Sequence, residues 1–128
     1  MKYIIANWKL NGSKSLLNEF LNQFANYKSN NYVVLCPPHL LLSHLDSITI
    51  DNFFMGSQNV SEYDNGAFTG EISAEMLADN KIVYSIVGHS ERRTLLAETN
   101  EKINIKIKQL LSHRSEEHTS ELQSPMYL

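Results

Sequence analysis

The chain has 128 residues, a formal net charge of −3, 42% hydrophobic residues and 20% charged residues. This balance is typical of a soluble globular domain, and it gives no reason to expect nucleic acid or a membrane as a partner. The single cysteine, Cys36, excludes an intramolecular disulfide, and the first apolar run is too short for a signal peptide or a membrane span, so we expect a cytoplasmic protein.

The first part of the chain alternates between short apolar runs and helical patterns. Residues 3–6 form a continuous apolar run, which is typical of a strand buried on both faces. Apolar residues recur at helical spacing over 16–24 and predict a helix. A second strand is predicted over 32–36, ended by two prolines, and a third over 53–57. A short helical segment over 40–45 separates them.

The same alternation continues after a long loop over residues 58–72. Ser73 is a suitable N-cap for the next helix, and residues 82–87 predict the fourth and clearest strand. A turn at residues 88–90 follows, where Ser90 can cap a helix, and Thr99 can cap a last helix with apolar residues at helical spacing.

This order predicts an α/β fold with a parallel sheet and right-handed crossovers. Two architectures fit: an open doubly wound sheet, and part of a (β/α)₈ barrel. No Gly-x-Gly-x-x-Gly follows the first strand, which disfavours a dinucleotide-binding domain.

Polar residues follow three of the predicted strands. In either architecture the strand exits gather on one face, where functional groups are expected. The residues at these exits are Asn7, Trp8 and Lys9, then Gln58 and Asn59, then His89, Ser90 and Glu91.

A lysine and a histidine at neighbouring exits suit the polarisation of a carbonyl and the binding of an anion. At a helix N-terminus the ring of His89 is expected to be neutral, so that it can donate a hydrogen bond to a substrate oxygen. The alternative is structural: a solvated Lys9, a locally hydrogen-bonded His89 and a surface charge cluster over 91–93. Spacing alone therefore predicts a phosphate- or carbonyl-handling α/β domain.

Three longer motifs narrow this prediction. They are Ala6-Asn7-Trp8-Lys9-Leu10-Asn11-Gly12, then Gln58-Asn59-Val60 with Gly66-Ala67-Phe68-Thr69-Gly70-Glu71-Ile72-Ser73, and Tyr84-Ser85-Ile86-Val87-Gly88-His89-Ser90-Glu91-Arg92-Arg93. In this order they resemble the signatures of the triosephosphate isomerase family, over about residues 1–113. The resemblance implies a (β/α)₈ TIM barrel truncated to about its first four β/α units.

The resemblance also implies an activity and roles for residues. The family interconverts dihydroxyacetone phosphate and glyceraldehyde 3-phosphate through an enediolate, in glycolysis and gluconeogenesis, with no metal or organic cofactor. By motif match, Lys9 would stabilise negative charge and Asn7 would position Lys9 and the triose phosphate substrate. His89 would be the neutral electrophile and proton shuttle, and Ser90 and Glu91 would support it.

A homodimer is implied as well. In the family, the loop that matches Thr69, Gly70 and Glu71 reaches into the site of the partner subunit. By the same match, Glu71 and Arg92 are candidates for an ion pair across that interface.

The family's glutamate base, after its sixth strand, matches no position of this sequence, so we expect negligible isomerase activity from these 128 residues alone. The predicted domains are 1–113, the N-terminal half of the barrel, and 114–128, a tail that resembles an in-frame translation of sequencing adapter. His113 and His118 are expected to face solvent and to bind no metal. A non-catalytic half-barrel is the alternative, and another phosphate-handling (β/α) enzyme is disfavoured because the first and third motifs occur together.

Overall fold

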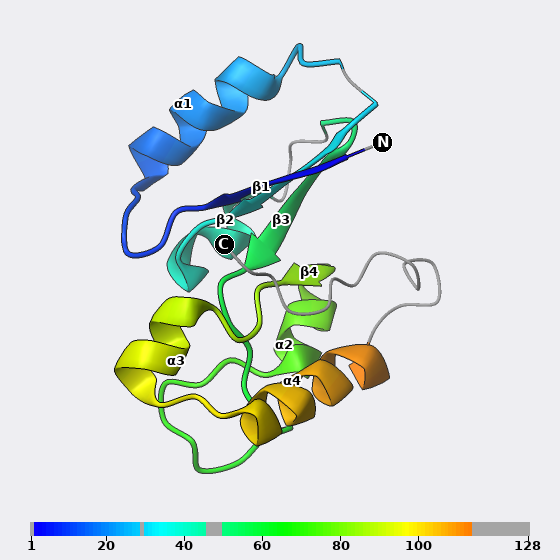
Figure 1. Ribbon diagram of the computed structural model, residues 1–128. Coiled ribbons are helices and arrows are strands. Elements are labelled where there is room, and N and C mark those ends of the chain that lie inside the picture. The colour runs from blue at the N-terminus through cyan, green and yellow to red at the C-terminus, as the bar shows by residue number, and fades with distance from the viewer. Residues whose placement is uncertain (1, 29, 46–49, 114–128) are drawn as a thin grey trace.

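The computed structural model describes residues 2–28, 30–45 and 50–113, and shows four successive β/α units (Figure 1). Four parallel strands form one sheet in the order β1-β2-β3-β4, which is the arrangement that the sequence predicts. The strands are β1 (Tyr3–Asn7), β2 (Tyr32–Cys36), β3 (Phe53–Ser57) and β4 (Tyr84–Ser85). The helices are α1 (Lys14–Phe24), the 3-10 helix η1 (His39–Leu45), α2 (Ala74–Asp79), α3 (Ser90–Leu96) and α4 (Asn100–His113).

Helix α1 covers one face of the sheet (Figure 1). It begins after Ser13, whose hydroxyl accepts a hydrogen bond from the backbone N–H of Leu16 at 3.0 Å. Leu17 and Leu21, one turn apart, are buried against the strands, whereas Leu16 is 44% exposed. The predicted helix is confirmed, but its buried stripe is narrower than the apolar pattern indicates.

Strand side chains alternate between two apolar clusters, as the pleat of a strand requires. Leu35 and Met55 belong to the larger cluster, which also contains Leu17 and Leu21 of α1. Cys36 lies in the other cluster, on the opposite face of the sheet. Burial raises the pKa of the Cys36 thiol to about 12, so this side chain is an inert core residue.

Strand β4 is shorter than the predicted 82–87. Its ladder pairs Tyr84 with Gly56 and Ser85 with Ser57 only. The N–H of Ile82 instead donates to the carbonyl of Leu77 in α2, so the start of the apolar run belongs to a turn. The end of the run, Ile86 and Val87, is fully buried, and its apolar character therefore reports burial and not strand length.

Helices α2, α3 and α4 lie together on the other side of the molecule from α1 (Figure 1). Ser73 caps α2, as predicted, by accepting from the N–H of Met76 at 3.1 Å. The hydroxyl of Thr99 accepts from the N–H of Lys102 at the start of α4. None of the helices described here has the length and apolar character needed to cross a membrane. The predicted tail, 114–128, lies outside the described residues.

Candidate active site

A cleft of about 610 Å³ lies where the strands end. Because the strands are parallel, the segments that follow all four of them meet at this edge of the sheet. The lining residues are Asn7, Lys9, Leu10, Pro38, His39, Gln58, Asn59, Gly70, Glu71, His89, Glu91, Arg92 and Leu96. Most of the predicted site residues are therefore brought together, whereas Ser90 and Thr69 are exposed and Trp8 packs edge-on against Phe20.

The backbone of Lys9 is held in an unusual conformation at the exit of β1. Its φ is 56°, in the left-handed region that costs a residue with a side chain about 1–3 kcal/mol. The side chain of Asn7 accepts from the Lys9 N–H at 2.9 Å. The side-chain amide of Gln58 donates to the carbonyl of Lys9 at 2.8 Å and to that of Cys36 at 3.0 Å. Residues at the ends of β1, β2 and β3 thus together fix the position of the Lys9 backbone.

The Lys9 ammonium forms an ion pair with Glu91 from the exit of β4, with 2.7 Å between Nζ and Oε1. The hydrogen bond from Lys9 is the main cause that lowers the pKa of Glu91 below its usual value. Both side chains are about half exposed, so solvent weakens the attraction and the pair is easily opened. The ammonium is therefore available to an anion that enters the cleft.

His89 enters the cleft from the N-terminus of α3. Its Nδ1 accepts a hydrogen bond from the backbone N–H of Glu91 at 3.1 Å, which makes His89 the N-cap and corrects the expectation that Ser90 has this role. A nitrogen that accepts carries no proton, so in the neutral ring the proton lies on Nε2. Nε2 is buried and has no hydrogen-bond partner within the described part of the chain.

Gly88 makes this approach possible. Its φ of 69° turns the chain out of β4, and a Cβ at this position would lie 2.8 Å from Cδ1 of Ile103 in α4. The position therefore requires glycine for both its conformation and its space. This turn places His89 at the end of the sheet while α4 packs directly behind it.

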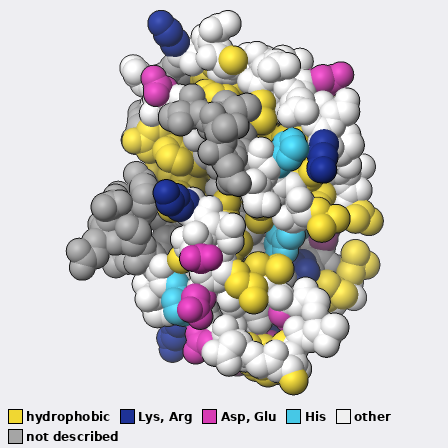
Figure 2. All heavy atoms as spheres, turned by 180° about the vertical axis from the view of Figure 1, so that it is seen from behind, with side chains coloured by type: hydrophobic (Ala, Val, Ile, Leu, Met, Phe, Trp, Pro, Cys, Tyr) yellow, Lys and Arg dark blue, Asp and Glu magenta, His cyan; other side chains and the backbone are white. Residues whose placement is uncertain are grey.

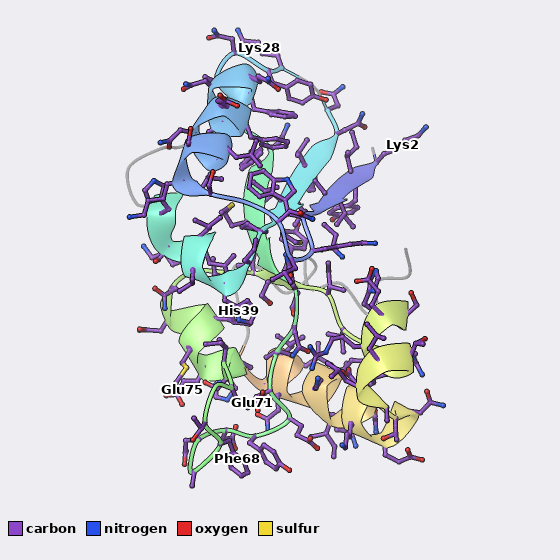
Figure 3. All side chains as sticks on the ribbon, turned by 90° about the vertical axis from the view of Figure 1, so that its left-hand side faces the viewer. Lys2, Lys28, His39, Phe68, Glu71 and Glu75 are labelled. Carbon is purple, nitrogen blue, oxygen red and sulfur yellow. The ribbon has the colours of Figure 1, made fainter. Side chains whose placement is uncertain are left out.

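His39 is a cleft residue that the sequence analysis missed (Figure 3). The pKa of His39 is lowered, mainly because the ring is partly buried, and the charge of Arg92 lowers it further. A hydrogen bond with the Asn59 backbone and the charge of Glu71 oppose this shift. His39 stands just after the two prolines that end β2. Its place at a strand exit is the sequence signal that points to it.

Behind the cleft wall lies a charge cluster in which Glu98 and Lys106 are buried, while Arg92 is partly exposed and lines the cleft. Glu98 Oε2 is 2.8 Å from Arg92 Nε and 3.1 Å from Lys106 Nζ, and the Glu98 and Lys106 side chains are only 4% and 5% exposed. Burial alone would raise the pKa of Glu98, but the hydrogen bonds from both cations outweigh it and lower this pKa.

This cluster contacts the cleft residue Asn59 and includes Arg92, which the sequence predicts at a subunit interface. Lys106 also donates to the side-chain oxygen of Asn59 at 2.9 Å. Arg92, predicted to pair with Glu71 of a second subunit, pairs with Glu98 inside this chain. The pair across subunits remains a prediction, since one guanidinium has donors for more than one acceptor.

The chemistry available in the cleft is that of anion and carbonyl binding. It contains a lysine ammonium, a histidine with a donor on Nε2 and several amides. Among the described residues, no group of three or more His, Cys, Asp or Glu side chains could hold a metal ion.

Comparisons with known proteins agree on one family. The sequence model described as triosephosphate isomerase matches residues 2–117. The triosephosphate isomerase of Alcanivorax borkumensis is 48% identical over 100 residues, which cover 78% of this chain and 40% of the relative. That of Idiomarina loihiensis is 45% identical over 111 residues, with 80% and 42% covered, and that of Buchnera aphidicola subsp. Cinara cedri is 48% identical over 107 residues, with 78% and 42% covered.

The chain spans about two fifths of the length of these relatives. The family match ends at residue 117, close to the boundary at 113 that the sequence predicts, and this boundary remains a prediction.

Proposed function

Because the chain belongs to the triosephosphate isomerase family, we propose that its cleft binds a triose phosphate and contributes to the interconversion of dihydroxyacetone phosphate and glyceraldehyde 3-phosphate. The family assigns the fold, so the four parallel strands are part of a (β/α)₈ TIM barrel. One observation supports the proposed chemistry above all: among the residues that the structure describes, none pairs with the buried Nε2 of His89, in a cleft that also contains the Lys9 ammonium.

In this proposal His89 is the electrophile and proton shuttle. Its Nδ1 is occupied by the N–H of Glu91, so Nε2 is the nitrogen that carries the proton to be donated. A donor at this atom polarises the substrate carbonyl and then stabilises the enediolate oxygen. The proton can pass back and forth between the two substrate oxygens without the ring becoming an imidazolium.

Lys9 stabilises the negative charge of the phosphate and of the enediolate. This role is supported by its place in the cleft and by the weak, solvent-exposed pair with Glu91, which an incoming dianion can displace. Asn7 positions Lys9 through the hydrogen bond to its N–H. Glu91 supports Lys9 through its side chain and His89 through its backbone N–H. The supporting role proposed for Ser90 rests on its motif alone.

The proposed assembly is a homodimer in which the loop bearing Thr69, Gly70 and Glu71 reaches the site of a second copy. The rings of Tyr63 and Phe68 in this exposed loop stack with their centroids 3.7 Å apart, which favours one loop conformation. Arg92 is the candidate partner of Glu71 in this interface, so both residues of the proposed ion pair are present in this chain. The proposed setting is glycolysis and gluconeogenesis in the cytoplasm.

We further propose that these 128 residues alone bind substrate but have negligible isomerase activity. The reaction needs a base next to the substrate carbon, and no position of the sequence matches the family's glutamate. Of the two glutamates in the cleft, Glu91 has a lowered pKa, which makes it a weaker base, and Glu71 lies on the exposed loop. Residues 114–128 are proposed to be a tail translated from sequencing adapter, which the coding nucleotides test by matching adapter sequence or not.

Ligand binding tests the function directly. The 128-residue chain is titrated with dihydroxyacetone phosphate and, as a matched ligand without a carbonyl, glycerol 3-phosphate. We expect Lys9→Met to weaken both ligands about tenfold or more, since a charge-assisted contact to phosphate is lost. His89→Gln should weaken the ketone more than the alcohol. Lys14→Met, on the exposed start of α1, is the control.

Two results would contradict the proposal. One is binding of both phosphates that is unchanged by Lys9→Met. The other is isomerisation by the parent chain at a rate above that of buffer, which would mean that these residues contain a base that the proposal lacks.

A further inference from the structure

The loop between β3 and α2, residues 58–72, runs beside α4 in both ribbon views (Figures 1 and 3). Three side chains of α4 contact it: Lys106 Nζ with Asn59 Oδ1 at 2.9 Å, Gln109 Nε2 with the Glu62 carbonyl at 3.3 Å, and His113 Nε2 with Asp64 Oδ1 at 3.4 Å. The spacing of three and four residues puts all three on one face of the helix. His113 therefore does not simply face solvent, as the sequence analysis expected.

The loop has a fixed base and an exposed excursion. At the base, the N–H of Ser61 donates to the carbonyl of Ile72 at 2.8 Å, and Val60 and Ser61 are buried. The excursion, residues 62–71, is exposed apart from the half-buried Glu62. It is ordered within itself by the stacking of Tyr63 on Phe68. Internal order alone does not set the direction in which the excursion points.

We propose that Gln109 and His113 are positioning residues, which hold the excursion 62–71 in the orientation needed to dock onto a second copy of this chain. This inference rests on the proposed homodimer. In this inference the orientation of the docking loop is set by Gln109 and His113 of α4, and not by the loop's own sequence.

Burial separates these two residues from the third contact. Lys106 is 5% exposed and shares Glu98 with Arg92, so it belongs to the buried cluster that holds the base. Gln109 is half-buried and His113 is 30% exposed, so neither contributes much to the core. Their hydrogen bonds hold the first residues of the excursion against α4, which reduces the conformational freedom of the excursion before docking. A loop that is already oriented loses less entropy on binding, and the complex is correspondingly tighter.

The experiment compares donors at one position of α4. In Gln109→Glu the shape is kept, but a carboxylate oxygen faces the Glu62 carbonyl; in Gln109→Lys a donor is retained. Gln109→Glu is combined with His113→Ala, and Lys108→Gln, on the exposed neighbouring face, is the control with the same charge change as Gln109→Glu. Amide hydrogen exchange of the full chain is followed over 62–71 and over β1–β3.

We expect exchange over 62–71 to be about tenfold faster in the combined variant, with β1–β3 unchanged, because two hydrogen bonds at the long end of the usual range are lost together. Gln109→Lys and Lys108→Gln should exchange like the parent. Sedimentation should show a dimer dissociation constant about tenfold higher in the combined variant only.

Unchanged exchange over 62–71, or equal acceleration over β1–β3, overturns the positioning role. The proposed homodimer is judged separately: a parent chain that stays monomeric at high concentration refutes the dimer, while the exchange result still decides whether α4 orients the loop.

Discussion

The two sides of this molecule are held together by different forces. On one side, α1 packs on β1–β3; on the other, α2, α3 and α4 gather around the loop 58–72 (Figure 1). The first side is built from aromatic contacts: Phe20 lies 5.6 Å from Trp8 and 4.9 Å from Phe24, and Phe24 lies 5.7 Å from Phe53, measured between ring centroids. Apolar contacts of this kind have no strict partner requirement.

The second side depends on charge. Every ion pair among the described residues includes a residue between His89 and His113. Figure 2 shows acidic, basic and histidine side chains together over the lower half of the molecule, where α2–α4 lie. The cleft borders on this side through Arg92 and Glu91. The region next to the proposed chemistry is thus the one that tolerates the loss of a single partner least.

The sharpest way to break this comparison is Glu98→Ala. It leaves Lys106, 5% exposed, without its counter-ion, and removes the partner of Arg92. Leaving a buried charge uncompensated costs about 3–5 kcal/mol, so we expect the free energy of unfolding to fall by that amount in urea denaturation. Glu19→Ala, an exposed glutamate of α1, should change it by less than about 0.5 kcal/mol. A loss equal to that control would mean that the cluster is solvated.

The matching test on the apolar side is Leu17→Ala. Leu17 is fully buried, and removing its methyl groups should lower the free energy of unfolding by about 2–5 kcal/mol through lost burial and a cavity. Leu16→Ala makes the same chemical change at the neighbouring position, which is 44% exposed, and should cost clearly less. Equal losses at the two positions, by urea denaturation, would contradict the orientation of α1.

Acid should weaken the stabilisation on the charged side and leave that on the apolar side unchanged. The pKa of Glu98 is lower in the folded chain than its ordinary value of 4.5, so its contribution is fully present above that value. The contribution is lost as the pH falls through the lowered folded pKa. We therefore expect the stability difference between the parent and Glu98→Gln to shrink on acidification, while the difference caused by Leu17→Ala stays constant. Urea midpoints measured from pH 7 downwards check this, and parallel curves would refute it.

The apolar side could be read from the sequence almost completely. Strands β2 and β3 have the predicted bounds, because each is a short apolar run that ends where proline or polar residues begin. The run at 82–87 was just as apolar, but only Tyr84 and Ser85 pair in the sheet, since apolarity signals burial whether or not a ladder forms. The apolar character of a segment therefore predicts its burial better than it predicts its pairing in the sheet.

The charged side could not be read in this way. In the sequence, Glu98 looks like a solvated residue before a helix and Lys106 like a residue of a solvated helix face. Their burial depends on where Arg92 and Asn59 lie in space. Lys106 and Asn59 are 47 positions apart, a separation that no local pattern encodes. The strand exits did predict that Asn7, Lys9 and His89 lie close together, because in a parallel sheet the exits must share an edge; their catalytic roles remain predictions.

The smallest effect is expected at the two serine caps, one on each side. Ser13 accepts from the Leu16 N–H at 3.0 Å and Ser73 from the Met76 N–H at 3.1 Å, so the lost hydrogen bonds are alike. Ser13 is exposed and water can replace its hydroxyl, whereas Ser73 is 6% exposed and its replacement leaves a donor poorly solvated. We expect Ser13→Ala to cost about 0.5 kcal/mol and Ser73→Ala about 2 kcal/mol in urea denaturation. Asp at the exposed position 13 should restore most of the loss there. A larger cost at Ser13 than at Ser73 would show that burial does not set the strength of these caps.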